Sequence, residues 1–198
     1  MRPVILCALV ALLASCVTLK RTGGDLKTEL EAMLEMDQSQ RMQMIRIGKK
    51  YGSASPEMEA LWKKQKTIDA ANTARLVEIV EQVGWPGIRL VGEPAARGAF
   101  LVLQHADYAL QKNYLPLFRT AVAAGEARPW NLALLEDRVL TREGKNQLYG
   151  SQWRKNSDDV WELYPIEDEP GVDKRRQALG MPPIAADAKG YGVEYHPK

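Results

Sequence analysis

The sequence is poor in the residues that most often carry reaction chemistry. Its 198 residues include only two cysteines, Cys7 and Cys16, and two histidines, His105 and His196. Two histidines are too few for a multi-histidine metal centre, so no metal or cofactor is expected. The Gly-Lys-Ser/Thr phosphate loop, Gly-x-Ser-x-Gly and His-Glu-x-x-His are also absent. The net charge of +2 argues against a nucleic-acid partner, since nucleic-acid binders usually carry a strong basic excess.

The composition that is present indicates one ordinary globular domain. Hydrophobic residues make up 45% of the chain and charged residues 26%, which are close to the averages of globular proteins. These fractions exclude a wholly disordered or collagen-like chain. The length suits one domain and is short for two.

The N-terminus has the organisation of a secretory leader. Arg2 precedes an apolar run over residues 3–14, which is too short to cross a bilayer as a helix, since a spanning helix needs about 20 residues. The letters LASC at residues 13–16 resemble the lipobox of bacterial lipoproteins, in which the cysteine is lipidated and the preceding segment removed. We therefore expect residues 1–15 to be a signal peptide and Cys16 to carry lipid. The alternatives are an ordinary secreted protein or a buried apolar strand.

Lipidation of Cys16 would leave the mature chain without a free thiol. A disulfide and a cysteine nucleophile are then both excluded, and residues 16–24 form a lipidated tether. Buried acyl chains anchor a protein without any transmembrane segment. Val17 is not the aspartate that resembles an inner-membrane retention signal, so we expect the outer membrane, facing the periplasm, if the cell is Gram-negative. The expected partners are the membrane and an unknown envelope ligand or protein.

Apolar residues recur at helical spacing through most of residues 25–184, which predicts a single helix-rich domain of the mainly α (α+β) class. Residues 185–198 are expected to be a loosely held polar tail. Two short strands over 146–154 and 160–164 predict one small β-hairpin. The predicted helices run from Asp25 toward Gly52 and over 56–83, 94–112, 113–125, 129–140 and 170–180.

Polar side chains interrupt the apolar faces of the first two predicted helices. Asp37 and Arg41 lie four residues apart on the same face as the apolar stripe, as either a core salt bridge or part of a site. Asn72 lies in line with the second stripe, and Asp69 is one helical turn before it. A buried amide destabilises the fold unless it finds hydrogen-bond partners, so Asn72 points to a structural or functional contact.

His105 is the one credible imidazole acid or base, because His196 lies near the C-terminus. It falls at the boundary of the apolar face of the third predicted helix, and Gly98 is expected to leave space above its ring. Asp107 follows two residues later, where side chains on one helix diverge by about 200°. Asp137 is therefore the expected partner of His105.

Several short motifs follow one another in a fixed order and resemble the bacterial domain-of-unknown-function family 6624, over roughly residues 37–184. That family has no established activity, so the resemblance implies kinship without a reaction. The motifs read GWP at 84–86, QHAD at 104–107, YLP at 114–116, DRV at 137–139, GxxQxYGSQ at 144–152 and VDxRRxxLG at 172–180. The family's polar positions fall on Asp37, Arg41, Asp69, Asn72, Gln104, His105, Asp107, Asp137, Arg138, Gln147, Tyr149 and Gln152.

Two interpretations of these polar positions stay open. They form either a buried hydrogen-bond network that fixes helix packing or a cleft for a ligand or substrate. The first function considered is a binding or accessory envelope lipoprotein that takes a peptide, glycan or protein partner. The second is a hydrolase-like enzyme with His105 as general base, oriented by Asp137. In that enzyme Arg41 or Arg138 holds an anionic group, Gln104, Gln147 and Gln152 position the substrate, and Tyr149 donates a proton; Asp69, Asn72 and Asp107 complete the candidate binding set.

Overall fold

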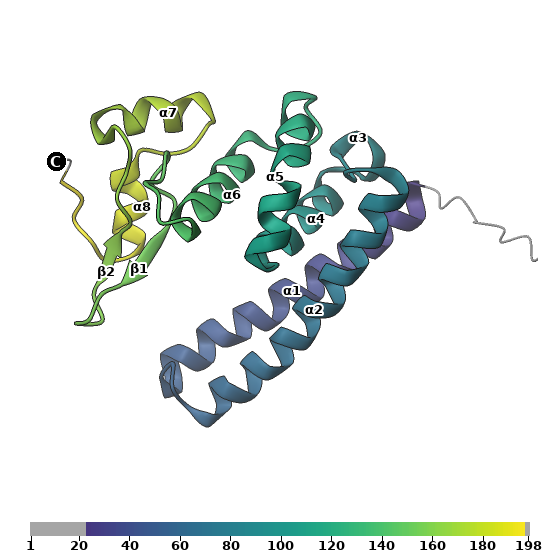
Figure 1. The fold of residues 1–198 in the computed structure, drawn as a ribbon. Coiled ribbons are helices and arrows are strands. Elements are labelled where there is room, and N and C mark those ends of the chain that lie inside the picture. Colours follow the sequence, from purple (N-terminus) through teal and green to yellow (C-terminus); the bar gives the residue numbers. More distant parts are fainter. Residues whose placement is uncertain (1–22, 197–198) are drawn as a thin grey trace, which may run out of the picture.

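The computed structural model describes residues 23–196, and its mainly α architecture confirms the predicted fold class (Figure 1). Cys16 and the predicted signal peptide lie outside the described residues. Within the described range, no helix is both long enough and apolar enough to cross a membrane.

Two long antiparallel helices, α1 (Gly23–Tyr51) and α2 (Pro56–Val83), form a hairpin that extends beyond the rest of the chain (Figure 1). The start of α2 follows its sequence, since Pro56 is the first helical residue and the Ser55 hydroxyl accepts the Met58 N–H at 3.2 Å. Gly84 ends α2 with a φ of 76°, which glycine adopts without steric cost.

The middle of the chain forms a short helix, α3 (Ile88–Val91), and three longer ones, α4 (Glu93–His105), α5 (Tyr108–Ala123) and α6 (Pro129–Arg142). The single helix predicted over 94–112 is wrong, because the chain breaks between α4 and α5. Asp107 causes this break by capping α5, where its carboxylate accepts the Leu110 N–H at 2.8 Å. The buried Gln111 amide donates to the carbonyls of Gln104 and Ala106 at 2.8 and 3.0 Å and so bridges the break.

The core lies where α4 packs against α1 and α2, with Phe100, Phe118 and Leu103 fully or almost fully buried. Gly98 allows the close approach of α4 to α1, because a Cβ atom there would lie 2.6 Å from the Leu30 carbonyl oxygen. The expected role of Gly98 above the His105 ring is therefore corrected: its missing side chain makes room for the α1 backbone.

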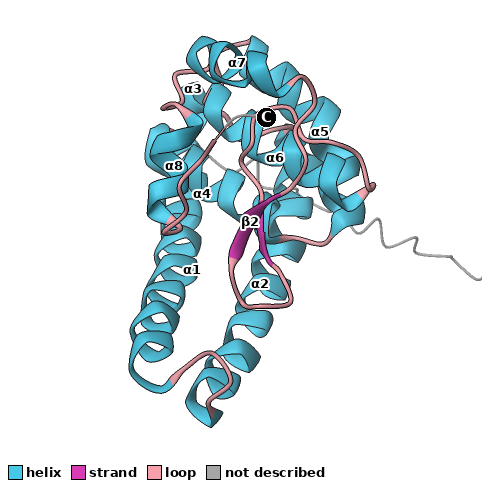
Figure 2. Cartoon of the chain, turned by 90° about the vertical axis from the view of Figure 1, so that its left-hand side faces the viewer, coloured by secondary structure: helices cyan, strands magenta, loops and turns pink. Residues whose placement is uncertain are grey.

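The C-terminal part packs beside α6 and contains the predicted hairpin, in shorter form. Strands β1 (Trp153–Lys155) and β2 (Trp161–Leu163) pair antiparallel with Trp153 opposite Leu163 (Figure 2). A 3₁₀ turn, η1 (Glu169–Gly171), leads into α7 (Val172–Ala178). The prediction of a loose tail from residue 185 is wrong for its first residues, because Ile184–Gly190 form the helix α8 and Ile184 is completely buried.

Candidate functional site

A network of charged and amide side chains joins α1 to α2. Asp37 on α1 is 2% exposed, and its Oδ1 accepts the Arg41 Nε–H at 2.9 Å. Arg41 also donates through Nη2 to Asp69 on α2 at 2.8 Å, so one guanidinium holds two carboxylates. The predicted Asp37–Arg41 pair is thus present, and Asp69 belongs to the same cluster.

Gln65 completes this network and was missed by the sequence reasoning. Its side chain is fully buried, and its Nε2 donates to Asp69 at 2.7 Å and to Asp37 at 3.3 Å. A pattern could have identified it, because Gln65 lies four residues before Asp69 and seven before Asn72 on one face of the helix.

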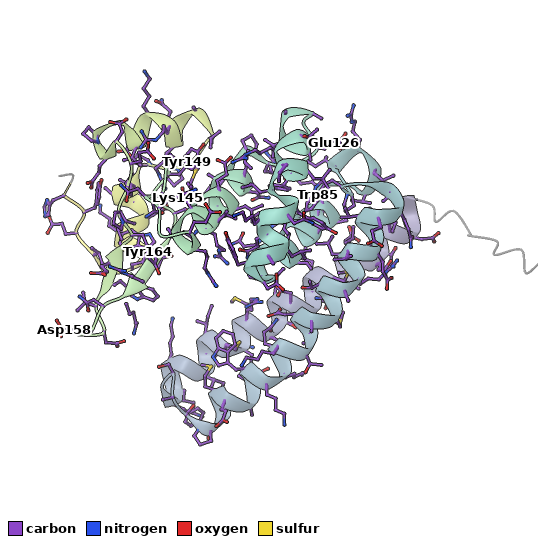
Figure 3. All side chains as sticks on the ribbon, viewed as in Figure 1. Trp85, Glu126, Lys145, Tyr149, Asp158 and Tyr164 are labelled. Carbon is purple, nitrogen blue, oxygen red and sulfur yellow. The ribbon has the colours of Figure 1, made fainter. Side chains whose placement is uncertain are left out.

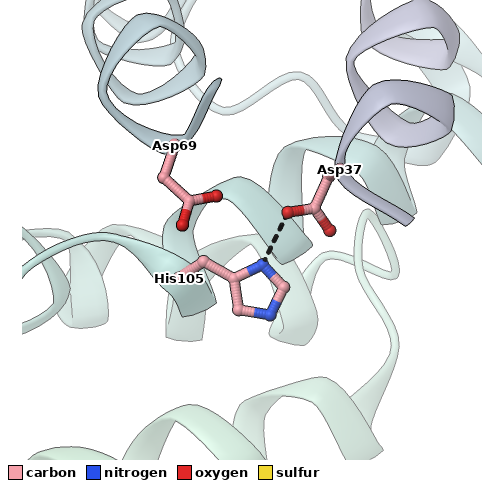
Figure 4. Close-up of side chains that lie close together, drawn as sticks. All are labelled: Asp37, Asp69 and His105. Atoms are coloured by element: carbon pink, nitrogen blue, oxygen red, sulfur yellow. Dashed lines mark hydrogen bonds and ion pairs between the residues drawn. The ribbon is translucent and has the colours of Figure 1, made fainter. Parts of the chain in front are cut away.

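His105 is the last residue of α4 and contacts this network from a third helix. Its Nδ1 lies 3.1 Å from Asp37 Oδ1, and its other ring nitrogen points away from both carboxylates (Figure 4). Burial acts to raise the pKa of Asp37, but the hydrogen bond and charge of His105 and the donors of Gln38 and Arg41 lower it to about 2. Because an ionised carboxylate only accepts, Nδ1 is the donor, and when the ring is neutral Nε2 is left as an acceptor.

The prediction that Asp137 orients His105 is wrong. Asp137 on α6 is fully buried, and its carboxylate accepts the backbone N–H groups of Leu148 at 2.7 Å, Tyr149 at 3.1 Å and Ser151 at 2.9 Å. Burial raises the pKa of Asp137, and these N–H donors act in the opposite direction. The carboxylate therefore shapes the 148–151 loop, and Asp37 is the aspartate that orients the imidazole.

Gln147 and Tyr149 belong to the same loop. The buried Gln147 amide donates to the carbonyls of Gln152 and Tyr164 at 3.1 and 2.8 Å and accepts the Gln152 N–H at 2.8 Å, which is a structural pattern. Tyr149 and Tyr164 lie in the C-terminal part of the molecule, as Figure 3 shows. Burial and the neighbouring Glu136 raise the pKa of Tyr149 to about 12. The predicted substrate contact of Gln147 is replaced by three contacts to the backbone.

Arg138, Gln104 and Gln152 form a second polar group, and Gln104 directly precedes His105 in the chain. Arg138 donates through Nη1 to the Gln104 carbonyl at 2.9 Å and through Nε to Gln152 Oε1 at 3.2 Å. Burial lowers the pKa of Arg138, and the positive charges of Arg142 and Arg41 act in the same direction. The structure thus brings three predicted binding residues together at the end of α4.

Two further predicted residues have different surroundings. Asn72 is buried as expected, and its Nδ2 has no hydrogen-bond partner among residues 23–196. Asp107 caps α5, as described above, and its carboxylate accepts a backbone N–H there. Its role in the described structure is therefore to start a helix.

Asp37, Asp69 and His105 are also a possible set of metal ligands. One ligand atom of each lies within 4.8 Å of the others. The guanidinium of Arg41 already bonds both carboxylates, so positive charge is supplied there by the protein itself. The cluster is therefore best described as an ion-pair network that fixes the imidazole.

These features define a helical protein in which a buried aspartate bonds a partly exposed histidine at the junction of three helices. The chain matches the model of a family of unknown function, DUF6624, over residues 24–193, and it belongs to that family. Comparison with curated proteins and with solved structures gives no match.

Proposed function

We propose that this protein is a hydrolase-like enzyme of the bacterial cell envelope in which His105 acts as general base. One observation carries the proposal: a buried, ionised Asp37 binds Nδ1 of His105 while the ring remains 18% exposed. An aspartate in this position holds the imidazole in one tautomer and stabilises the imidazolium that forms during proton transfer.

The proposed reaction is the hydrolysis of an ester-type bond. His105 Nε2 takes a proton from water as the water oxygen forms a bond to the electrophilic centre of the substrate. The bond to the leaving group then breaks, and the imidazolium returns the proton to the leaving oxygen. The Asp37–Arg41–Asp69 network keeps the ring in place throughout, because each carboxylate is bonded to more than one donor.

The location of this enzyme is part of the proposal. Lipid on Cys16, the residue after the predicted signal peptide, would hold the domain at the envelope membrane, and the outer membrane if the cell is Gram-negative. Mass spectrometry of the membrane-extracted protein should find acyl chains on Cys16, and Cys16→Ala should move the protein into the soluble fraction. Wild-type protein without lipid would contradict the anchoring.

The catalytic proposal is tested by the hydrolysis of p-nitrophenyl acetate and p-nitrophenyl phosphate. His105→Gln should lower the rate by about 100-fold or more, which is the usual contribution of a general base. Asp37→Asn should also lower the rate. His196→Gln is the matched control, because this histidine side chain is 77% exposed, and it should retain the wild-type rate. A wild-type chain inactive on both esters, or an active His105→Gln, would contradict the proposal.

A second candidate function is the binding of an envelope glycan, peptide or protein, and one feature favours it. A hollow of about 370 Å³ beside the β-hairpin is lined by Trp153, Trp161, Tyr164 and Tyr195, among others. The Trp153 ring stacks on Tyr191 with ring centres 4.6 Å apart. Aromatic rings with polar edges suit such partially wet surfaces. Trp161→Ala should weaken binding to envelope glycans and leave ester hydrolysis unchanged if both candidates hold.

A further inference from the structure

We propose that Arg138 and Arg142 bind a phosphate group of the substrate beside His105. This inference rests on the proposed function, since it names the substrate class of the same site. It is carried by the lack of an ion pair at both arginines within the described residues, the partial burial of Arg138 and the position of the two side chains on α6.

Most arginines of the described residues form ion pairs with carboxylates, and Arg138 does not. Its hydrogen bonds go to two neutral acceptors, the Gln104 carbonyl and the Gln152 amide oxygen. The paired arginines are Arg41, Arg75, Arg89, Arg119, Arg128, Arg154, Arg175 and Arg176.

Three other arginines among residues 23–196 also lack an ion pair, but Arg138 is more buried than they are. Arg46, Arg97 and Arg142 are exposed, so water solvates their charges. Arg138 is only partly exposed, and burying an unpaired charge destabilises a protein strongly. A ligand anion would supply the charge that the described residues do not.

The position of Arg138 links this unpaired charge to the proposed base. The guanidinium is bonded to the carbonyl of Gln104, whose neighbour in the chain is His105. Arg138 also lies within electrostatic range of Arg41, which shares Asp37 with the imidazole. An anionic group bound here would therefore lie close to the end of α4 that carries the base.

A second guanidinium without a carboxylate partner in the described part of the chain favours phosphate over carboxylate. Arg142 follows Arg138 by one helical turn on α6, and the two positive charges repel each other. Two guanidinium groups match a phosphate ester, which carries up to two negative charges and three acceptor oxygens, better than a singly charged carboxylate.

The test is titration of the full-length chain with inorganic phosphate in a calorimeter, at constant ionic strength, with acetate as the comparison ligand. Wild type should bind phosphate and should bind acetate at least about 10-fold more weakly. Arg138→Gln should weaken phosphate binding about 10-fold or more, as expected for the loss of a charge-assisted bond. Arg142→Gln should weaken it by a smaller factor, and Arg97→Gln, an exposed unpaired arginine on α4, should leave it unchanged.

Three variants keep the test decisive if Arg138→Gln misfolds or if the proposed function fails. Arg138→Lys retains the charge and should keep part of the affinity, and Arg142→Gln alters only an exposed side chain. His105→Gln should lose hydrolysis but keep phosphate binding. The phosphate site is refuted if the wild type does not bind phosphate or binds acetate equally well. It is also refuted if both arginine variants bind phosphate as tightly as the wild type. Phosphate binding lost in Arg138→Gln, with hydrolysis unaffected in His105→Gln, would support the site and refute the catalytic role.

Discussion

Replacing Asp137 by asparagine tests the conclusion that this carboxylate shapes a loop. The wild-type carboxylate accepts three backbone N–H groups, from Leu148, Tyr149 and Ser151. Asparagine has one acceptor oxygen and points an NH₂ group at donors, so at least one buried N–H loses its partner, at a cost of about 1–3 kcal/mol. Because burial raises the pKa of Asp137, removing the negative charge offsets part of this loss.

We therefore expect Asp137→Asn to lower the free energy of unfolding by about 2 kcal/mol, a large fraction of the 5–15 kcal/mol typical of a domain. Asp137→Ala should cost more, about 4 kcal/mol, since every N–H partner is lost. The measurement is urea unfolding followed by circular dichroism at 222 nm. Asp158→Asn, in an exposed turn, is the control and should change the free energy by less than about 0.5 kcal/mol. Asp137→Asn as stable as this control would refute the loop-shaping role.

Two further predictions concern Asp37 and Gly98. The pKa of Asp37 is lowered to about 2, so its ionised form stabilises the fold above the unfolded pKa near 4 and this stability is lost as the pH falls toward 2. In urea unfolding, the stability difference between wild type and Asp37→Asn should shrink by about 2 kcal/mol over that interval; a constant difference would contradict the pKa shift. Gly98→Ala should lower the unfolding free energy by about 1–3 kcal/mol, because its Cβ would lie 2.6 Å from the Leu30 carbonyl oxygen. Gly190→Ala meets no atom within 4 Å and should be neutral, and equal stability of the two variants would argue against the close helix contact.

The local parts of the fold could be predicted because short-range chemistry decides them. Ser55 and Pro56 start α2, and Gly84 ends it, at the expected residues. The break between α4 and α5 was missed because Ala106 continues the apolar pattern of α4 past His105. Asp107 as a helix cap competes with that pattern. The bonds from Gln111 to the carbonyls of Gln104 and Ala106 stabilise the break, and the periodicity of apolar residues does not predict them.

The site was only partly predictable because its central contact joins residues far apart in the chain. Asp37 and Arg41 are one helical turn apart, so their pairing follows from spacing. The bond between Asp37 and His105 depends on how α4 packs across α1, which no local pattern specifies. Excluding Asp107 by helical geometry left Asp137 as the nearest motif aspartate, and the structure assigns that carboxylate to backbone N–H groups instead.

In the structure, the family's polar positions fall into two groups with different surroundings. Asp137 and Gln147 are completely buried and bond to backbone groups, so their hydrogen-bonding capacity is used in holding the 147–152 segment. His105 and Arg138 are partly exposed, and each retains a nitrogen without a partner in the described range. Titratable groups that stay partly exposed and partly unbonded beside an ionised aspartate are candidates for a functional site. For this reason the chemistry of the protein is best sought at the end of α4, between His105 and Arg138.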